Sequence, residues 1–306
     1  MNFTAKDVAA LREKTGCGMM DCKKALTEAE GNMDRAIELL REKGLAASAK
    51  KAGRIAAEGM AYAAVLDGVG VVVEVNAETD FVGKNEKFVD FVKGVAATVA
   101  KCDPADLDAL MECKYDGSDL TVLQQQQEMV LVIGENIKVR RFARFADGFN
   151  VAYVHAGGKI GVLVSLNVEG GIDATEIGKD VAMQIAALNP RFWDKSQVGQ
   201  DVLDEEKKIM MVQMENDPKM ASKPEAVREK IVMGKLNKFY SENCLLQQEF
   251  VKDGSMSVEK YIESSAKALG GKVTFKDAVR FEKGEGIEKK QENFAAEIAS
   301  MVKGNG

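Results

Sequence analysis

The chain has 306 residues, which is enough for two or three domains that each bury a hydrophobic core. With 46% hydrophobic and 29% charged residues, the composition is that of a folded globular protein and argues against disorder. A formal net charge of -6 argues against nucleic-acid binding by the chain as a whole, and no apolar run reaches the roughly 20 residues that span a bilayer.

The first 44 residues predict three short helices, separated by capping residues and glycines. Helix starts are expected at Thr4, Asp21 and Asn32, and helix ends at Gly16, Gly31 and Gly44. Between the first two helices, the run TGCGMM places Met19 and Met20 in an exposed, glycine-flanked loop. Residues 45–58 are rich in alanine and lysine and predict a helical linker. Residues 1–54 are therefore interpreted as a small binding module with its linker.

A strand pair is predicted next, at 61–76, where apolar β-branched residues flank a turn at Asp67-Gly68. The elements expected after it are helices at 84–101 and 118–133 and a strand at 137–145. Residues 55–148 are interpreted as the first subdomain of a core.

The same pattern recurs 91 residues further along the chain, where 152–167 aligns without gaps on 61–76. The identical pairs are Ala61/Ala152, Tyr62/Tyr153, Gly70/Gly161, Val71/Val162, Val73/Val164 and Asn76/Asn167. A helix is again expected after the strand pair, at 175–188. Six identities in sixteen positions favour a duplicated α+β core, with 149–198 and 243–284 as its second subdomain.

Two amphipathic stretches, at 201–216 and 223–243, interrupt the second subdomain and are separated by Asp217-Pro218. A connection this short predicts an antiparallel helical hairpin over 199–242, with its methionines packed between the helices. The elements expected after the hairpin are a helix at 258–270, a strand at 272–284 and a closing helix at 287–302 within a C-terminal helical module, 285–306.

Few residues could perform covalent chemistry or hold a metal. His155 is the only histidine and the five cysteines form no C-x-x-C pair, so no catalytic triad, metal site or disulfide framework is expected. The glycine-rich fragments at 67–70 and 156–161 precede β-branched residues, which indicates hairpin turns and not phosphate loops. We therefore expect no cofactor and no enzymatic activity. The odd cysteine count and the lack of an apolar signal segment predict a cytoplasmic protein.

The two copies diverge directly after Asn76 and Asn167, where the first continues AETDFV and the second VEGGID. Thr79 is expected to cap the helix that follows, and Asp80 suits the dipole of its first turn. Phe81 fits two alternatives equally. It either packs inward or protrudes as an aromatic anchor of the kind that forms interface hot spots.

Five motifs together resemble the elongation factor Ts family. They are TGCGMMDCKKAL (15–26), TDFV (79–82) followed by KN (84–85), IGENIKVRR (133–141), HAGGKIGVLV (155–164) and VRFEKGEGIEK (279–289). Their common order over about residues 6–302, with a helical insertion in the same place, makes the resemblance specific. It implies an α+β fold in which a three-helix module like the ubiquitin-associated domain precedes a two-part core. A helical hairpin would project from the second part, and a C-terminal module would follow.

The resemblance also implies a function. Members of this family catalyse the release of GDP from the GTPase elongation factor Tu during translation elongation, without covalent chemistry. Matched onto this chain, the segment Thr79–Val82 would enter the GTPase. Phe81 would wedge between helices near the magnesium site, and Asp80 would disturb the metal and its water network there.

Further partner contacts follow from the same resemblance. Met19 and Met20 would contact the GTPase domain, and His155, Gly157 and Gly158 would lie toward another domain of the partner. Neither nucleic acid nor membrane would be contacted directly, and the complex is either one-to-one or a dimer of heterodimers. A passive adaptor and a cofactor-dependent enzyme are the alternatives to this function.

The chain departs from the family pattern at two positions. Ala77 stands where a cysteine is frequent, and Gly83 stands where alanine is usual. In a first helical turn, glycine is expected to weaken the helix by up to about 1 kcal/mol relative to alanine. Gly83 is therefore expected to loosen the hold on Phe81.

Overall fold

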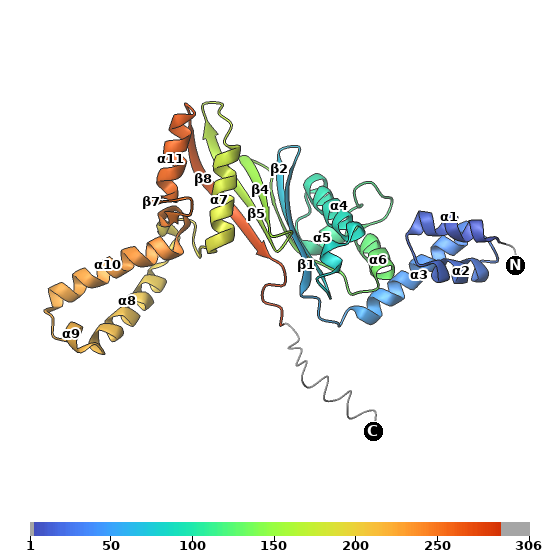
Figure 1. The fold of residues 1–306 in the computed structure, drawn as a ribbon, viewed down its shortest axis with the longest axis horizontal. Helices are drawn as coiled ribbons and strands as arrows, with labels where there is room; N and C mark the ends of the chain where they lie inside the picture. Colours follow the sequence, from blue (N-terminus) through green and yellow to red (C-terminus); the bar gives the residue numbers. More distant parts are fainter. Residues whose placement is uncertain (1–2, 289–306) are drawn as a thin grey trace, which may run out of the picture.

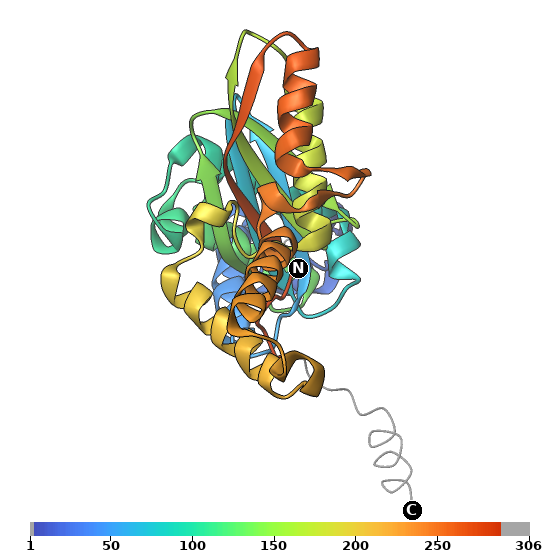
Figure 2. The ribbon, with the colours of Figure 1, turned by 90° about the vertical axis from the view of Figure 1, so that its left-hand side faces the viewer.

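The computed structural model describes residues 3–288, so the closing helix expected at 287–302 lies outside the described residues from position 289 on. Figure 1 shows an elongated molecule with the N-terminal helices at one end, a helical hairpin at the other and the sheets between them. Seen from the hairpin end, the two long hairpin helices lie in front of the sheets (Figure 2). Helices thus combine with small antiparallel sheets, which confirms the expected α+β class.

Three helices form the N-terminal part, as predicted. They are α1 (Ala5–Thr15), α2 (Met19–Glu28) and α3 (Met33–Lys51). Thr4 and Asp7 form a capping box at the start of α1. The expected capping role of Asp21 is wrong, because α2 begins upstream of it with Gly18 as N-cap. Asp21 lies in the first turn of α2 and pairs with Lys43 of α3.

Helix α3 runs through Gly44, where the sequence pattern predicted its end. A Cβ at Gly44 would lie 3.2 Å from the carbonyl oxygen of Gln127 in α6 (Val122–Ile133). The glycine therefore lets two helices approach closely and does not terminate one of them. The stretch expected to be a linker, 45–58, is helical as far as Lys51 and is docked on the core.

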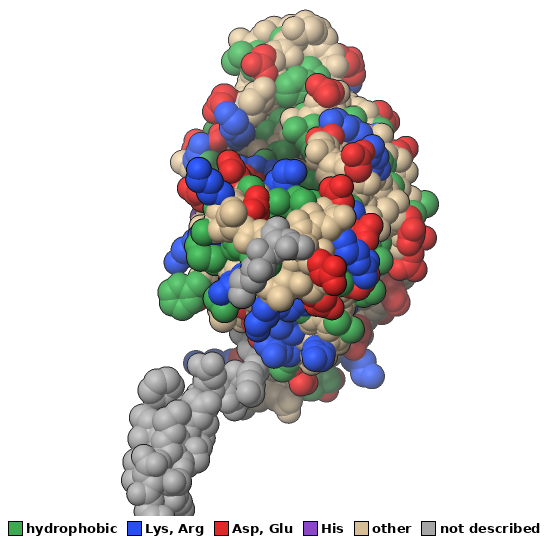
Figure 3. Space-filling model, turned by 90° about the vertical axis from the view of Figure 1, so that its right-hand side faces the viewer, with side chains coloured by type: hydrophobic (Ala, Val, Ile, Leu, Met, Phe, Trp, Pro, Cys, Tyr) green, Lys and Arg blue, Asp and Glu red, His purple; other side chains and the backbone are tan. Residues whose placement is uncertain are grey.

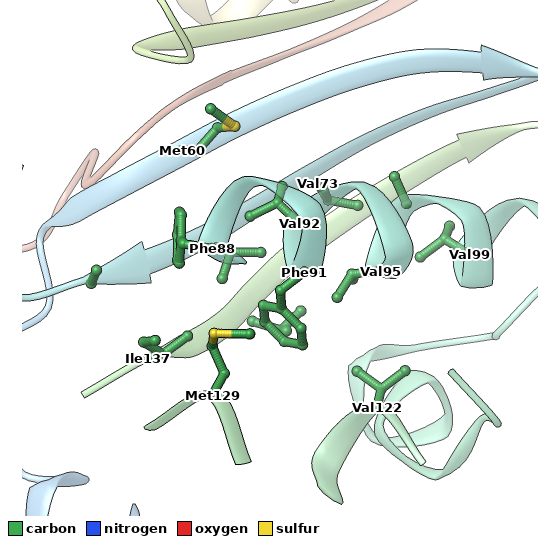
Figure 4. Packing of buried hydrophobic residues seen from close by; sticks show 14 of the residues in the cluster. Met60, Val73, Phe88, Phe91, Val92, Val95, Val99, Val122, Met129 and Ile137 are labelled. Atoms are coloured by element: carbon green, nitrogen blue, oxygen red, sulfur yellow. The ribbon is translucent and has the colours of Figure 1, made fainter. Parts of the chain in front are cut away.

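The first sheet unit consists of three strands and three helices. They are β1 (Glu58–Leu66), β2 (Val69–Ala77), α4 (Glu86–Cys102), α5 (Leu107–Glu112), α6 and β3 (Lys138–Phe145). The strands form an antiparallel sheet in the order β1-β2-β3, with the predicted turn at Asp67 and Gly68. Helix α4 lies along the sheet, and its Phe88, Phe91 and Val92 are buried in the core between them (Figure 4).

The second sheet unit repeats this plan. Its elements are β4 (Phe149–His155), β5 (Ile160–Glu169), α7 (Thr175–Leu188), α11 (Val258–Ala268) and β8 (Lys272–Glu282). The strand order is β4-β5-β8, and α7 packs against the sheet as α4 does in the first unit. Both sheets carry a register shift, at Glu74/Val75 in β2 and at Ser165/Leu166 in β5. These shifts are also 91 residues apart, so the offset read from the sequence recurs in the backbone.

The two sheets pack face to face through equivalent positions. Their shared cluster contains Ala61, Ala63, Val72, Leu163 and Phe281, surrounded by Ala143, Phe145, Ala152, Val154 and Val279. A Cβ on Gly70 would meet Leu163, and a Cβ on Gly161 would meet Val72. Because Gly161 corresponds to Gly70 and Leu163 to Val72, the interface has an approximate two-fold symmetry.

The predicted helical hairpin extends from the second unit. It comprises α8 (Gln200–Glu215), the short α9 (Pro218–Ala221) and α10 (Glu225–Asn243). Met210 and Met214 are buried in the hairpin core as expected, whereas Met233 is exposed. A strand pair after the hairpin, β6 (Glu249–Phe250) and β7 (Asp253–Ser257), is too short for its alternation to be visible in the sequence. Within residues 3–288, no helix has the length and apolar character needed to cross a membrane.

Candidate functional site

The segment between β2 and α4 presents Phe81 to solvent. Its side chain is 78% exposed, more than that of any other large hydrophobic residue in the described range. Phe81 lies in a turn directly before a single-turn 3-10 helix, η1 (Val82–Lys84), whose Val82 is buried. Of the two alternatives for Phe81, the structure therefore excludes inward packing.

The helix-capping role expected of Thr79 is wrong. The N-cap of α4 is Asn85, whose Oδ1 accepts hydrogen bonds from the amides of Lys87 at 3.0 Å and Phe88 at 3.4 Å. Thr79 and Asp80 precede η1 and belong to no helix, so the first-turn placement of Asp80 is also wrong. Sequence patterns did not reveal η1 because a single turn has too few residues to show periodicity.

A carboxylate distant in sequence, Glu135, holds the start of this turn. Glu135 lies in the short connection between α6 and β3. Its Oε2 accepts hydrogen bonds from the amides of Glu78 at 3.1 Å and Thr79 at 3.0 Å, and its Oε1 accepts one from the Thr79 hydroxyl at 2.7 Å. Bonds to an ionised acceptor are stronger than those between neutral groups. The Thr79 side chain is thus used to position the turn.

At the other end of the turn, Gly83 allows η1 to pack closely against β1. A Cβ at Gly83 would lie 2.8 Å from the carbonyl oxygen of Gly59, closer than atoms can approach without a shift. Because Gly83 lies in η1 and not in α4, the expected weakening of the first helical turn is wrong. The glycine instead permits a close backbone approach beside the buried Val82. Phe81 is therefore supported on both sides.

Asp80 is exposed next to Phe81. Within residues 3–288, its carboxylate has neither a hydrogen-bond nor an ion-pair partner. The turn thus offers an aromatic ring and an unpaired negative charge side by side, and both are free to interact with another molecule.

Met19 and Met20 form a second exposed apolar group. They are 54% and 62% exposed and occupy the first turn of α2, not the loop expected from the sequence. The helices that carry them are fixed to the first sheet unit, because Leu131 and Val132 of α6 pack against their hydrophobic cluster. Figure 3 shows this end of the molecule, where hydrophobic, basic and acidic side chains are mixed.

His155 is the last residue of β4, and Gly157 and Gly158 lie in the β4–β5 turn that follows it. His155 is exposed, and its Nδ1 lies 3.0 Å from the Tyr153 hydroxyl. Gly157 and Gly158 both adopt positive φ, which explains why glycine suits these positions. The Gly158 carbonyl accepts a hydrogen bond from the Ala61 amide at 2.8 Å. The turn therefore docks on β1, and Gly158 has an intramolecular role.

Glu74 of β2 is a fully buried carboxylate that no sequence motif singled out. Its Oε1 accepts hydrogen bonds from Arg140 at 2.9 Å and the Gly284 amide at 2.8 Å, and its Oε2 accepts one from Arg141 at 2.5 Å. Burial raises the pKa of Glu74, but the Gly284 amide, Asn76 and the two arginines outweigh it and hold the pKa below its usual value. This network ties the turn after β8 to the first sheet.

In the part of the chain that the structure describes, no three His, Cys, Asp or Glu side chains are grouped so that they could hold a metal ion. What the geometry provides is an aromatic ring and a carboxylate on a turn supported at both ends. An exposed aromatic ring beside a carboxylate is typical of protein interaction surfaces, so these features favour the class of binding proteins.

Comparison with known proteins identifies the family. A family model described as Elongation factor TS matches residues 78–285. Elongation factor Ts of Syntrophotalea carbinolica is 47% identical over 307 residues, which cover 99% of this chain and all of the relative. Elongation factor Ts of Clostridium perfringens is 50% identical over 304 residues, covering 98% and 99% of the two chains. The chain therefore belongs to the elongation factor Ts family, as its five motifs predicted.

Proposed function

We propose that this chain is a guanine-nucleotide exchange factor that binds elongation factor Tu and accelerates GDP release during translation elongation. The observation that carries the proposal is the 78% exposure of Phe81 on a turn that is hydrogen-bonded to Glu135 and packed closely against β1 at Gly83. Rigid aromatic side chains of this kind dominate the energetics of protein interfaces. Membership of the elongation factor Ts family supports the choice of partner.

The segment Thr79–Val82 approaches the GTPase near its bound magnesium ion. Asp80 and Phe81 are the side chains that enter the partner, because Val82 is buried in the core of the first sheet unit. Phe81 separates packed side chains of the partner, and Asp80 disturbs the water and metal network. Since magnesium neutralises charge on the nucleotide phosphates, displacing it weakens GDP binding. A factor that binds the nucleotide-free GTPase more tightly must weaken GDP binding by the same ratio. No covalent bond changes, so the chain acts as an exchange catalyst and not as an enzyme.

Two further contacts complete the proposed interface. Met19 and Met20 contact the GTPase domain, where their flexible side chains suit an adaptable surface. His155 and Gly157 face another domain of the partner, while Gly158 fixes their turn against β1. The complex forms in the cytoplasm without direct nucleic-acid or membrane contact, either one-to-one or as a dimer of heterodimers.

The proposed domains follow the same assignment. They are an N-terminal module of the ubiquitin-associated type at 1–54, core subdomains at 55–148 and at 149–198 with 243–284, a hairpin at 199–242 and a C-terminal module at 285–306. The symmetric sheet interface and the matching register shifts support an origin of the two subdomains by duplication.

Release of a fluorescent GDP analogue from elongation factor Tu, followed by stopped flow, tests the function. The native chain accelerates release, and Phe81→Ala slows that release about 30-fold, since a hot-spot side chain contributes about 2 kcal/mol or more. Leu269→Ala is the matched control, because Leu269 is a 53% exposed apolar residue after α11 in the second sheet unit. This variant retains the native rate.

The adaptor alternative gives a different result in the same experiment. An adaptor binds elongation factor Tu but leaves the rate of GDP release unchanged, with or without Phe81. Binding without acceleration by the native chain would therefore rule out the exchange function.

A further inference from the structure

We propose that Glu135 is a positioning residue for nucleotide exchange, which fixes the turn that carries Phe81 without touching the partner. This inference rests on the proposed function, because it assigns a role in the same site. Glu135 lies in the motif IGENIKVRR (133–141), but the family resemblance gives it no role, and it is 56 positions from Thr79 in the sequence.

The geometry uses both carboxylate oxygens of Glu135. After β2 ends at Ala77, the amides of Glu78 and Thr79 have left the sheet ladder and need another acceptor. Oε2 of Glu135 accepts from both amides, and Oε1 accepts from the Thr79 hydroxyl. One side chain thus fixes two successive peptide groups and one rotamer, two residues before Phe81.

The connection is reciprocal. Oε1 of Glu78 accepts hydrogen bonds from the Asn136 amide at 2.6 Å and from Arg54 Nη1 at 3.3 Å. The Asn136 side-chain amide in turn donates to the Arg54 carbonyl at 2.8 Å. Glu135, in the connection before β3, thus accepts from backbone amides of the connection after β2, and Glu78, in the connection after β2, accepts from the Asn136 amide before β3. Arg54, which follows α3, bonds to both connections.

Helix α3 also reaches this junction directly, since Lys51 in its last turn donates to the Gly134 carbonyl. Gly134 immediately precedes Glu135 and caps α6 in the left-handed conformation. The junction therefore connects three parts of the molecule: the N-terminal helices, the end of α6 and the turn with Phe81.

Removing the Glu135 carboxylate releases the start of the turn. The amides of Glu78 and Thr79 lose their shared acceptor. The hydrogen bonds to the Glu78 side chain and the close approach of Gly83 to β1 remain, but neither fixes the peptide groups directly before Phe81. A disordered anchor must be ordered during binding, which lowers the population of the productive complex. Encounter through other surfaces does not require this order, so the effect falls on the maximal rate of exchange.

The test compares four full-length variants in GDP release from elongation factor Tu, with the rate measured over a range of factor concentrations. Glu135→Ala and Thr79→Val lower the maximal rate, the former about tenfold, which corresponds to loss of a charge-assisted hydrogen bond. Half-saturating concentrations stay within about twofold of native, because encounter through the other surfaces does not require an ordered turn. Glu135→Gln keeps one acceptor oxygen and gives an intermediate rate. Asp119→Ala removes an exposed carboxylate of the same sheet unit and leaves the rate unchanged.

Amide hydrogen exchange provides a second readout that does not depend on elongation factor Tu. The amides of Glu78 and Thr79 are protected in the native chain and lose protection in Glu135→Ala, whereas amides within β1 and β2 stay protected. Protection of the strands also shows that the variant is folded. Fast exchange of both amides in the native chain would overturn the inference.

The kinetic outcomes separate the two proposals. If Phe81→Ala slows GDP release but Glu135→Ala and Thr79→Val do not, the positioning role of Glu135 is wrong and the exchange function stands. If Phe81→Ala has no effect, the proposed function of the turn fails and the inference fails with it.

Discussion

The two sheet units share a strand order, a helix position and a register shift, yet their second strands lead to opposite outcomes. In the first unit, β2 continues into the turn that exposes Phe81. In the second, β5 continues through Gly170 and Gly171, both with positive φ, to Ile172. Ile172 occupies the position equivalent to Phe81 and packs against the core of its own unit. A common scaffold thus supports an exposed anchor in one unit and a core contact in the other.

A second difference lies at the register shift itself. The first unit has the buried Glu74 with its two arginines, whereas the equivalent Ser165 donates a single hydrogen bond to the Asp147 carbonyl at 3.2 Å. The first unit, which exposes Phe81, therefore also carries the buried carboxylate that binds the Gly284 amide in the turn after β8. Divergence of the two units extends beyond the connection that carries the anchor.

The largest effect is expected from replacing, in separate variants, the two equivalent side chains at the register shifts, Glu74 in β2 and Ser165 in β5. Glu74→Ala leaves two arginines and the Gly284 amide without their shared buried acceptor, and we expect a loss of about 3–5 kcal/mol in the free energy of unfolding. Ser165→Ala removes one neutral hydrogen bond and is expected to lose about 1 kcal/mol. Urea unfolding measures both. Equal losses would show that the charge network contributes no more stability than the single hydrogen bond of Ser165.

The pH dependence sharpens the same test. Because the pKa of Glu74 is lowered in the folded state, its stabilisation is present above the unfolded-state pKa of about 4.3 and is lost as the pH falls through the folded value. Relative to Glu74→Gln, the native chain therefore loses its stability advantage in acid. A difference between the two that stayed constant from pH 7 to pH 3 would contradict the lowered pKa.

The symmetric interface provides a test of intermediate size. A Cβ at Gly70 would lie 2.6 Å from Leu163, and a Cβ at Gly161 would lie 3.2 Å from the Ala61 backbone and Val72. Gly70→Ala and Gly161→Ala are each expected to lose about 1–3 kcal/mol in thermal or urea unfolding, because both overpack the sheet interface. Gly234→Ala, in an exposed and open part of α10, serves as the control and does not destabilise. If only one of the two variants lost stability, the two halves of the sheet interface would not be packed equivalently.

The smallest expected effect concerns Phe81 and Ile172. Ile172→Ala removes a half-buried core contact and is expected to lower the free energy of unfolding by about 1–2 kcal/mol. Phe81→Ala removes an exposed ring and is expected to change it by no more than about 0.5 kcal/mol. Calorimetric unfolding of both variants decides the matter. A large loss with Phe81→Ala would mean that the ring also supports the fold.

Elements with a long regular pattern were predictable from the sequence. The helix expected at 175–188 has those bounds, and the turn at Asp67-Gly68 lies where the two strands meet. Apolar periodicity and turn residues are local properties, so they survive without knowledge of the tertiary structure. The repeat with an offset of 91 residues was visible for the same reason.

Features that depend on distant contacts were not predictable. Gly44 resembles a helix terminator, but its role is set by Gln127 of a helix far along the chain. Thr79 resembles a cap, but its hydroxyl bonds to Glu135. The exposure of Phe81 could not be decided locally either, because it follows from these supports and from the approach of Gly83 to β1. In each case a tertiary contact overrides a local preference.

The continuity of α3 bears on how the two proposed partner contacts, at Met19 and Met20 and at Phe81, would combine. Had the helix ended at Gly44, Met19 and Met20 would be tethered flexibly to the unit that carries Phe81, and the second contact would form at a millimolar effective concentration. Because α3 is unbroken and docked on α6, the spacing between the two groups is built into the fold. The molecule then presents the two groups at a fixed distance from each other. A partner surface with matching spacing gains from both contacts at once, and one with different spacing gains from only one.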